Sequence, residues 1–76
     1  MREKIFEEIR RKRIPKGGVW RIQEYNSFLV DKTSKERQDF RGCMHTLCEE
    51  GLFIMEMAPE PMYRLTEKGE SVIYAP

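Results

Sequence analysis

The sequence of 76 residues has no long hydrophobic run, few cysteines and almost no net charge. No segment approaches the roughly 20 apolar residues that a membrane-spanning helix needs. The first residues, MREKIFEEIRRKR, do not have the pattern of a secretory signal peptide. These features predict a cytoplasmic protein with no membrane partner.

The two cysteines, Cys43 and Cys48, fall within one predicted helix. Five helical residues separate their Cα atoms by about 7.5 Å along the axis, which is too far for a disulfide. His45 lies between them, but on a helix the three side chains point in divergent directions and no fourth ligand is evident. We therefore expect reduced thiols, no bound metal and no cofactor.

Patterns of catalysis are missing as well. His45 has no acid or nucleophile arranged near it in the sequence. The glycine pair in PKGG lacks the strand–loop–helix context of a phosphate-binding loop. The chain is therefore predicted not to be an enzyme.

Charged residues are abundant but balanced, with 14 basic and 13 acidic side chains and a net charge of +1. Residues 1–50 hold 12 basic and 9 acidic residues, a net of +3, and residues 51–76 hold 2 and 4, a net of −2. This asymmetry favours an oriented binding surface.

Apolar spacing predicts two helices in the first half of the chain. Ile5, Phe6 and Ile9 lie on one helical face, which Ile14 extends before Pro15 ends the helix. Residues 22–29 show a second apolar face at helical spacing. Between these helices, residues 19–20 are compatible with a very short strand.

A third helix is predicted from about residue 34 to residue 50. Thr33 with Glu36 three residues later is the capping-box signature of a helix start, and Gly51 is typical of a helix end. At 100° per residue, one face carries the apolar residues Phe40, Cys43, Met44 and Leu47.

After Gly51 the pattern changes to short β-prone runs. LFIMEM and MYRL flank APEP, which predicts a hairpin with a rigid, acidic tip. Thr66 then begins a short last helix in EKGESVIY. The whole chain is expected to form one domain, residues 1–76, of a mainly α, α+β class.

Two segments resemble the winged helix-turn-helix superfamily of DNA-binding domains, especially its small prokaryotic and phage members. They are LCEEGLF, at the end of the third helix, and YRLTEKGESVI, the second hairpin strand with the last helix. Together they span roughly the C-terminal half. The resemblance implies a three-helix core, a two-stranded wing and a short C-terminal helix. It also implies double-stranded DNA as partner, for a small transcriptional regulator or accessory protein that acts as a homodimer.

In such domains the third helix commonly enters the DNA major groove. Lys35 and Arg41 have the chemistry to reach phosphates or guanine edges, and Gln38 has the geometry to read adenine. Gly42 weakens the helix by roughly 1 kcal/mol relative to alanine, which favours a close approach by a groove wall or a partner. The alternative is an ordinary solvated face on which Gly42 relieves local crowding. The candidate DNA-binding residues are Ser34, Lys35, Gln38, Arg41, Gly42 and His45.

The basic segment that follows the first apolar face offers a second set of contacts. Its candidates for phosphate binding are Arg10, Arg11, Arg13 and Lys16. The alternative is a solvated helix end, because Glu7–Arg11 and Glu8–Lys12 have the favourable order for ion pairs four residues apart.

A protein-interaction module without DNA binding is the other function that the sequence allows. The near-neutral net charge, the acidic hairpin tip and the absence of a basic wing favour it. The two hypotheses differ in whether charge reversal at Lys35 and Arg41 abolishes binding.

Overall fold

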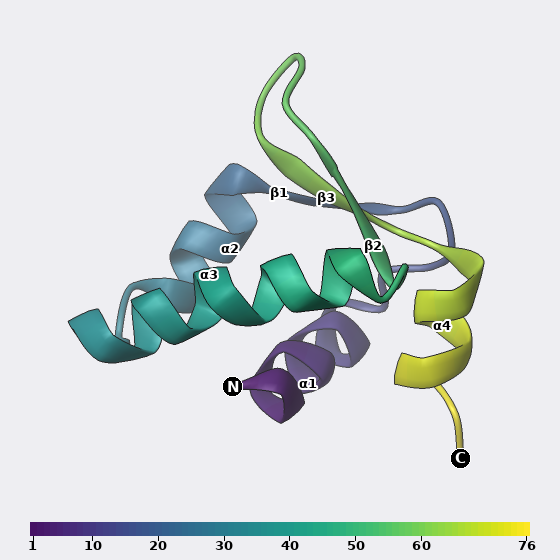
Figure 1. The fold of residues 1–76 in the computed structure, drawn as a ribbon, viewed down its shortest axis with the longest axis horizontal. Helices are drawn as coiled ribbons and strands as arrows, with labels where there is room; N and C mark the ends of the chain where they lie inside the picture. The colour runs from purple at the N-terminus through teal and green to yellow at the C-terminus, as the bar shows by residue number, and fades with distance from the viewer.

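The computed structural model describes all 76 residues as four helices and a three-stranded antiparallel sheet (Figure 1). The helices are α1 (Arg2–Lys12), α2 (Ile22–Leu29), α3 (Ser34–Glu49) and α4 (Glu67–Ile73), and the strands are β1 (Val19–Arg21), β2 (Phe53–Glu56) and β3 (Met62–Leu65). α3 is the longest element. The β2–β3 hairpin projects from the body of the molecule above α3 (Figure 1).

The sheet has one strand more than the predicted two-stranded wing, so that prediction was incomplete. β1 pairs with β3, placing Trp20 opposite Tyr63, and β3 also pairs with β2 in the order β1-β3-β2. Backbone hydrogen bonds between Gly17, Gly18 and Leu65 extend the β1–β3 ladder beyond the strand ends. Pairing with β3 thus provides hydrogen-bond partners for backbone N–H and C=O groups of residues 17–21, which the short segment lacks on its own.

α1 ends before the predicted Ile14 position. Arg13 adopts a left-handed conformation (φ 54°), and Pro15 disfavours helical geometry at the residue before it. Ile14 nevertheless turns back into the core, where it is 7% exposed. The apolar pattern therefore identified a core residue correctly but extended the helix too far.

Both ends of α3 have the predicted caps. The Thr33 hydroxyl accepts from the Glu36 N–H at 3.2 Å, and the Glu36 carboxylate accepts from the Thr33 N–H at 3.1 Å. At the other end Gly51 has φ 84°, and Leu52 N–H donates to the Leu47 carbonyl at 2.9 Å. This 6→1 bond is that of a Schellman motif.

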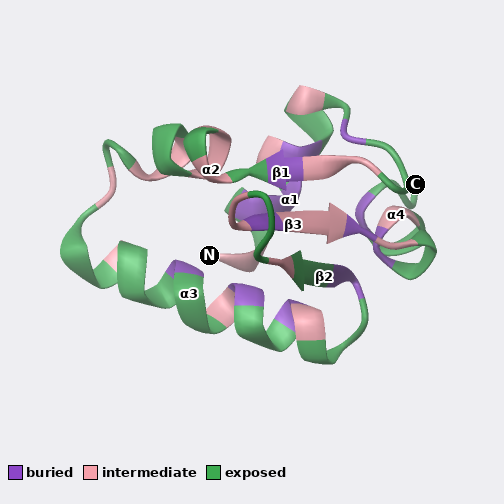
Figure 2. Cartoon of the chain, turned by 90° about the horizontal axis from the view of Figure 1, so that it is seen from above, coloured by how far each residue is buried: buried purple, intermediate pink, exposed green.

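One buried cluster joins α1, α3 and α4 to one face of the sheet, and partly buried side chains of α2 pack against it. Phe40, Met44 and Leu47 contribute from α3 as predicted, whereas Cys43 is only half-buried. α4 closes the cluster with Ile73, which has no exposed surface. Gly69 packs so closely on the Leu52 carbonyl that no side chain fits there. Figure 2 shows the result, with buried residues on one side of α3 and a continuous exposed side opposite.

Candidate nucleic-acid interface

The outward side of α3 carries every DNA-binding residue predicted from the sequence. All six are exposed: Ser34, Lys35, Gln38, Arg41, Gly42 and His45. Figure 2 shows that one side of α3 is exposed along the helix. Neither Lys35 nor Arg41 has a side-chain hydrogen bond or salt bridge within the protein. His45 lies 3.4 Å from the Glu49 carboxylate one turn further on. Two cations of α3 are thus free to meet a ligand.

Gly42 has no neighbour that would require a glycine. A Cβ atom built at this position has no contact within 4 Å, and the backbone is helical. The Gly42 carbonyl also accepts a hydrogen bond from the Thr46 hydroxyl at 3.1 Å. Crowding inside the protein therefore does not explain the missing side chain.

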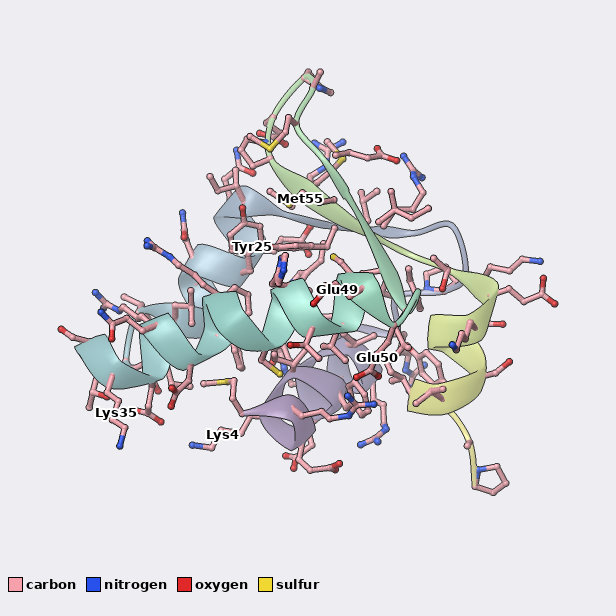
Figure 3. The ribbon with its side chains drawn as sticks, viewed as in Figure 1. Lys4, Tyr25, Lys35, Glu49, Glu50 and Met55 are labelled. Carbon is pink, nitrogen blue, oxygen red and sulfur yellow. The ribbon has the colours of Figure 1, made fainter.

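The two flanks of α3 differ in charge. Toward α1, Glu36 and Glu50 are held by Lys4 (3.2 Å) and Arg2 (3.1 Å), so acidic groups anchor this flank. Toward α2 and the hairpin lie the guanidiniums of Arg37 and Arg41. Lys35 sits at the N-terminal end of α3 and points away from the hairpin (Figure 3). The structure therefore does not bring Lys35 together with Arg41.

Two hollows lie on the basic flank and share Arg41, and we call them together the α3 groove. One, of about 330 Å³, is lined by Asn26, Leu29, Val30, Arg37 and Arg41. The other, of about 300 Å³, lies between α3 and the hairpin and is lined by Arg41, His45, Cys48, Met55 and Tyr63. Figure 3 shows Tyr25 and Met55 on the hairpin side of α3. Arg41 is at the junction of the two hollows.

Arg37 is a groove residue that the sequence reasoning missed. Its guanidinium donates to the Leu29 carbonyl at 3.2 Å and to the Val30 carbonyl at 3.3 Å. These carbonyls belong to the end of α2, so Arg37 fixes the turn between α2 and α3. Helical periodicity places Arg37 near the edge of the apolar face, which is why it gave no signal as a binding residue.

The basic residues near the end of α1 lie in a different part of the molecule. Arg10 donates to the Ile73 carbonyl at 2.7 Å, and Lys16 approaches Glu67 at 3.9 Å, both at α4. Arg13 lines a hollow with Glu70 and Tyr74. No residue of this set lines the α3 groove, so the structure keeps the two predicted basic sets apart.

The predicted partners of the ion pairs along α1 are wrong. Arg11 forms two hydrogen bonds with Glu8, at 2.9 and 2.7 Å, rather than pairing with Glu7. Its guanidinium lowers the pKa of the Glu8 carboxyl. Lys12 pairs with Glu24 of α2 at 3.0 Å, because tertiary packing places that carboxylate closer. Of the four phosphate candidates, only Arg13 has a side chain without a hydrogen bond or ion pair in the protein.

Both cysteines are free and half-buried, and burial raises the pKa of each thiol. They are therefore mainly protonated at neutral pH. No group of three His, Cys, Asp or Glu side chains is placed to hold a metal ion. No helix is long and apolar enough to cross a membrane.

Comparison of the chain with protein-family models, with curated proteins and with solved structures gave no match.

Proposed function

We propose that the chain is a winged helix-turn-helix domain that binds double-stranded DNA through α3. The element order supports this proposal, since helix, strand and two helices precede a hairpin. The observation that carries it is Arg41, an exposed and unpaired guanidinium in the middle of α3, next to a glycine with open space in front of it. A guanidinium is suited to bidentate contact with phosphate or guanine.

In this proposal α3 enters the major groove, with Gly42 allowing close approach and with Gln38 and Arg41 facing base edges or phosphates. His45 borders the same surface, whereas Ser34 and Lys35 extend it toward the N-terminal end of α3. The protein then acts as a small cytoplasmic transcriptional regulator or accessory protein. A homodimer belongs to the same proposal, because one small module buries little surface on DNA.

Fluorescence anisotropy with a labelled duplex, at low and at moderate salt, tests this function. We expect binding that weakens with salt, because each phosphate contact releases counterions. The double variant Lys35→Glu and Arg41→Glu should lose this binding. Lys68→Glu is the matched control, since it changes the charge of an exposed and unpaired lysine on α4. Absence of duplex binding even at low salt contradicts the proposal.

The second candidate is a protein-interaction module, and the hairpin favours it. Ile54 and Met57 are 52% and 65% exposed, and no basic residue lies between Phe53 and Tyr63. A protein partner that is still bound by the double charge-reversal variant, with no duplex binding by the wild type, would establish this alternative instead.

A further inference from the structure

The three tyrosines use their hydroxyl groups differently. The Tyr74 hydroxyl lies 2.7 Å from the Ile14 carbonyl and 3.1 Å from the Ile9 carbonyl, so it joins α4 to α1. The hydroxyls of Tyr25 and Tyr63 have no hydrogen-bond partner in the protein, although both rings are partly buried. Neither hydroxyl is a buried atom without a partner, so both hydroxyls reach the solvent. These two are therefore available to a ligand.

Both rings are held firmly in place. The centroids of Tyr25 and Tyr63 are 5.4 Å apart, and Tyr25 also stacks on Phe40 at 5.8 Å. Tyr63 contacts Phe53 edge-on at 6.4 Å. Aromatic contacts of this kind lock side-chain rotamers, so a ligand bound by these hydroxyls meets donors that are already oriented.

Tyr63 lines the α3 groove, in the hollow between α3 and the hairpin that it shares with Arg41 and His45. Tyr25 lines neither hollow, but its ring packs against that of Tyr63 from α2 and so lies beside the groove. Figure 3 shows Tyr25 on the hairpin side of α3. Met55 and Cys48 supply the apolar part of the lining. The guanidinium of Arg41 and the phenol of Tyr63 thus face one volume of about 300 Å³.

The chemistry of this volume suits an anion with several acceptor oxygens. Burial raises the pKa of both Tyr25 and Tyr63, so each hydroxyl keeps its proton at neutral pH and can donate it. Arg41 adds donors and no acceptor. No carboxylate lines the hollow. The acidic neighbour of Tyr25, Glu60, is already engaged by Gln23 at 3.1 Å and by Arg21 at 3.5 Å.

We propose that the hydroxyls of Tyr25 and Tyr63, together with Arg41, bind a backbone phosphate of the DNA in the α3 groove. This inference rests on the proposed DNA-binding function and extends it to a specific subsite. A phosphate presents only acceptor oxygens, and tyrosine hydroxyls are among the side chains that contact DNA phosphates. The subsite anchors one strand beside α3 and fixes the register in which α3 meets the bases.

The variants Tyr25→Phe and Tyr63→Phe test this subsite, because each removes one hydroxyl and keeps the ring that packs in the core. We expect each to weaken duplex binding about ten- to a hundredfold, the range of one hydrogen bond to a charged acceptor. The dependence of affinity on salt should stay the same, since a neutral phenol releases no counterion. Arg41→Gln should instead make the slope shallower by about 1.

Tyr74→Phe is the matched control, since it removes a hydroxyl that serves only the fold. It should lower the melting temperature and leave the affinity of the folded protein unchanged. Wild-type affinity in both Tyr25→Phe and Tyr63→Phe, with duplex binding intact in the parent, overturns the subsite and leaves the DNA-binding function standing. A shallower salt dependence in Tyr25→Phe or Tyr63→Phe, like that of Arg41→Gln, also overturns the subsite, because the hydroxyls would then act only by holding a cation in place. Absence of duplex binding by the wild type overturns both.

Discussion

At the residue scale, substitution of Gly42 should change fold stability and DNA affinity in opposite directions. Alanine at this position meets no atom within 4 Å, so Gly42→Ala should stabilise the fold by roughly 0.5–1 kcal/mol through helix propensity alone. The added methyl group points outward, where it should keep a DNA groove at a distance and weaken duplex binding. Urea unfolding and anisotropy measure the two effects. Unchanged affinity in a stabilised variant shows that no partner comes close to Gly42.

Single residues also show the limit of prediction from sequence. Helical periodicity placed Arg41 and Gly42 outward correctly, because the direction of a helical side chain depends only on residues a few positions away. Tyr25 and Tyr63 gave no such signal. Whether a hydroxyl has a partner depends on how α2 packs against β3, and the sequence does not encode that contact locally.

At the element scale, α3 depends on its N-terminal cap. Thr33→Ala removes the acceptor of the Glu36 N–H and should lower the free energy of unfolding by about 1 kcal/mol. Thr33→Ser keeps the hydroxyl and should stay near the wild type. Urea titration followed by circular dichroism compares them. Equal stability of the alanine variant means that water replaces the cap at no cost.

The orientation of the hairpin depends on Glu60, which links it to the start of α2. Glu60→Ala removes the contacts with Arg21 and Gln23 and should speed hydrogen exchange at the tip end of the β2–β3 ladder, where Glu56 pairs with Met62. Overall stability should change little, because exposed ion pairs contribute little. Glu67→Ala, at an exposed position on α4, is the control. Identical exchange in both variants shows that strand pairing alone orients the hairpin.

The elements differ in how well sequence alone predicts them. α3 was predicted to within one residue of its end, because it has sixteen residues, a capping box and a terminal glycine. β1 has three residues, too few for an alternating pattern, and its partner β3 comes much later in the chain. Elements with local signals were therefore predictable, and the third strand was only a possibility.

At the scale of the whole molecule, the distribution of cations limits the electrostatic part of DNA binding. Lys35, Arg37 and Arg41 are the basic residues of α3. At the basic end of α1, Arg10 contacts α4, whereas Arg11 and Lys12 pair with Glu8 and Glu24. A monomer should therefore show a slope of log affinity against log salt of about −2 to −3, and a dimer about twice that. Anisotropy between about 50 and 200 mM salt gives the slope, with sedimentation to determine the oligomer. A much steeper slope for a monomer requires contacts from the α1 end as well.

The pH dependence of stability should have two limbs with different physical origins. Hydrogen bonds hold the pKa values of four carboxyl groups below their ordinary values of 3.8 to 4.5. Arg11 lowers the pKa of Glu8, Lys32 that of Asp31, the Thr33 backbone that of Glu36, and Arg64 that of Glu56. Their stabilisation is present above those ordinary values and is lost as the pH falls through the lower folded-state values. Burial instead raises the pKa values of both cysteines and all three tyrosines, so the unfolded chain ionises first. Stability should therefore also fall as the pH rises above 9 to 10, the ordinary range of these groups.

Salt distinguishes the two limbs. Asp31 is largely exposed, whereas Glu8, Glu36 and Glu56 are partly covered, so about 1 M salt should weaken the acid limb without removing it. The alkaline limb arises from burial and should persist at the same salt concentration. Urea midpoints at about pH 3, 7 and 10, followed by far-UV circular dichroism with and without salt, measure both limbs.

Glu56→Gln should flatten part of the acid limb, because it removes the carboxylate held by Arg64 at 2.7 Å. A constant midpoint from neutral to acid pH contradicts a role for these pairs in stability, whereas an alkaline limb that vanishes in salt means that charge, not burial, controls the tyrosines.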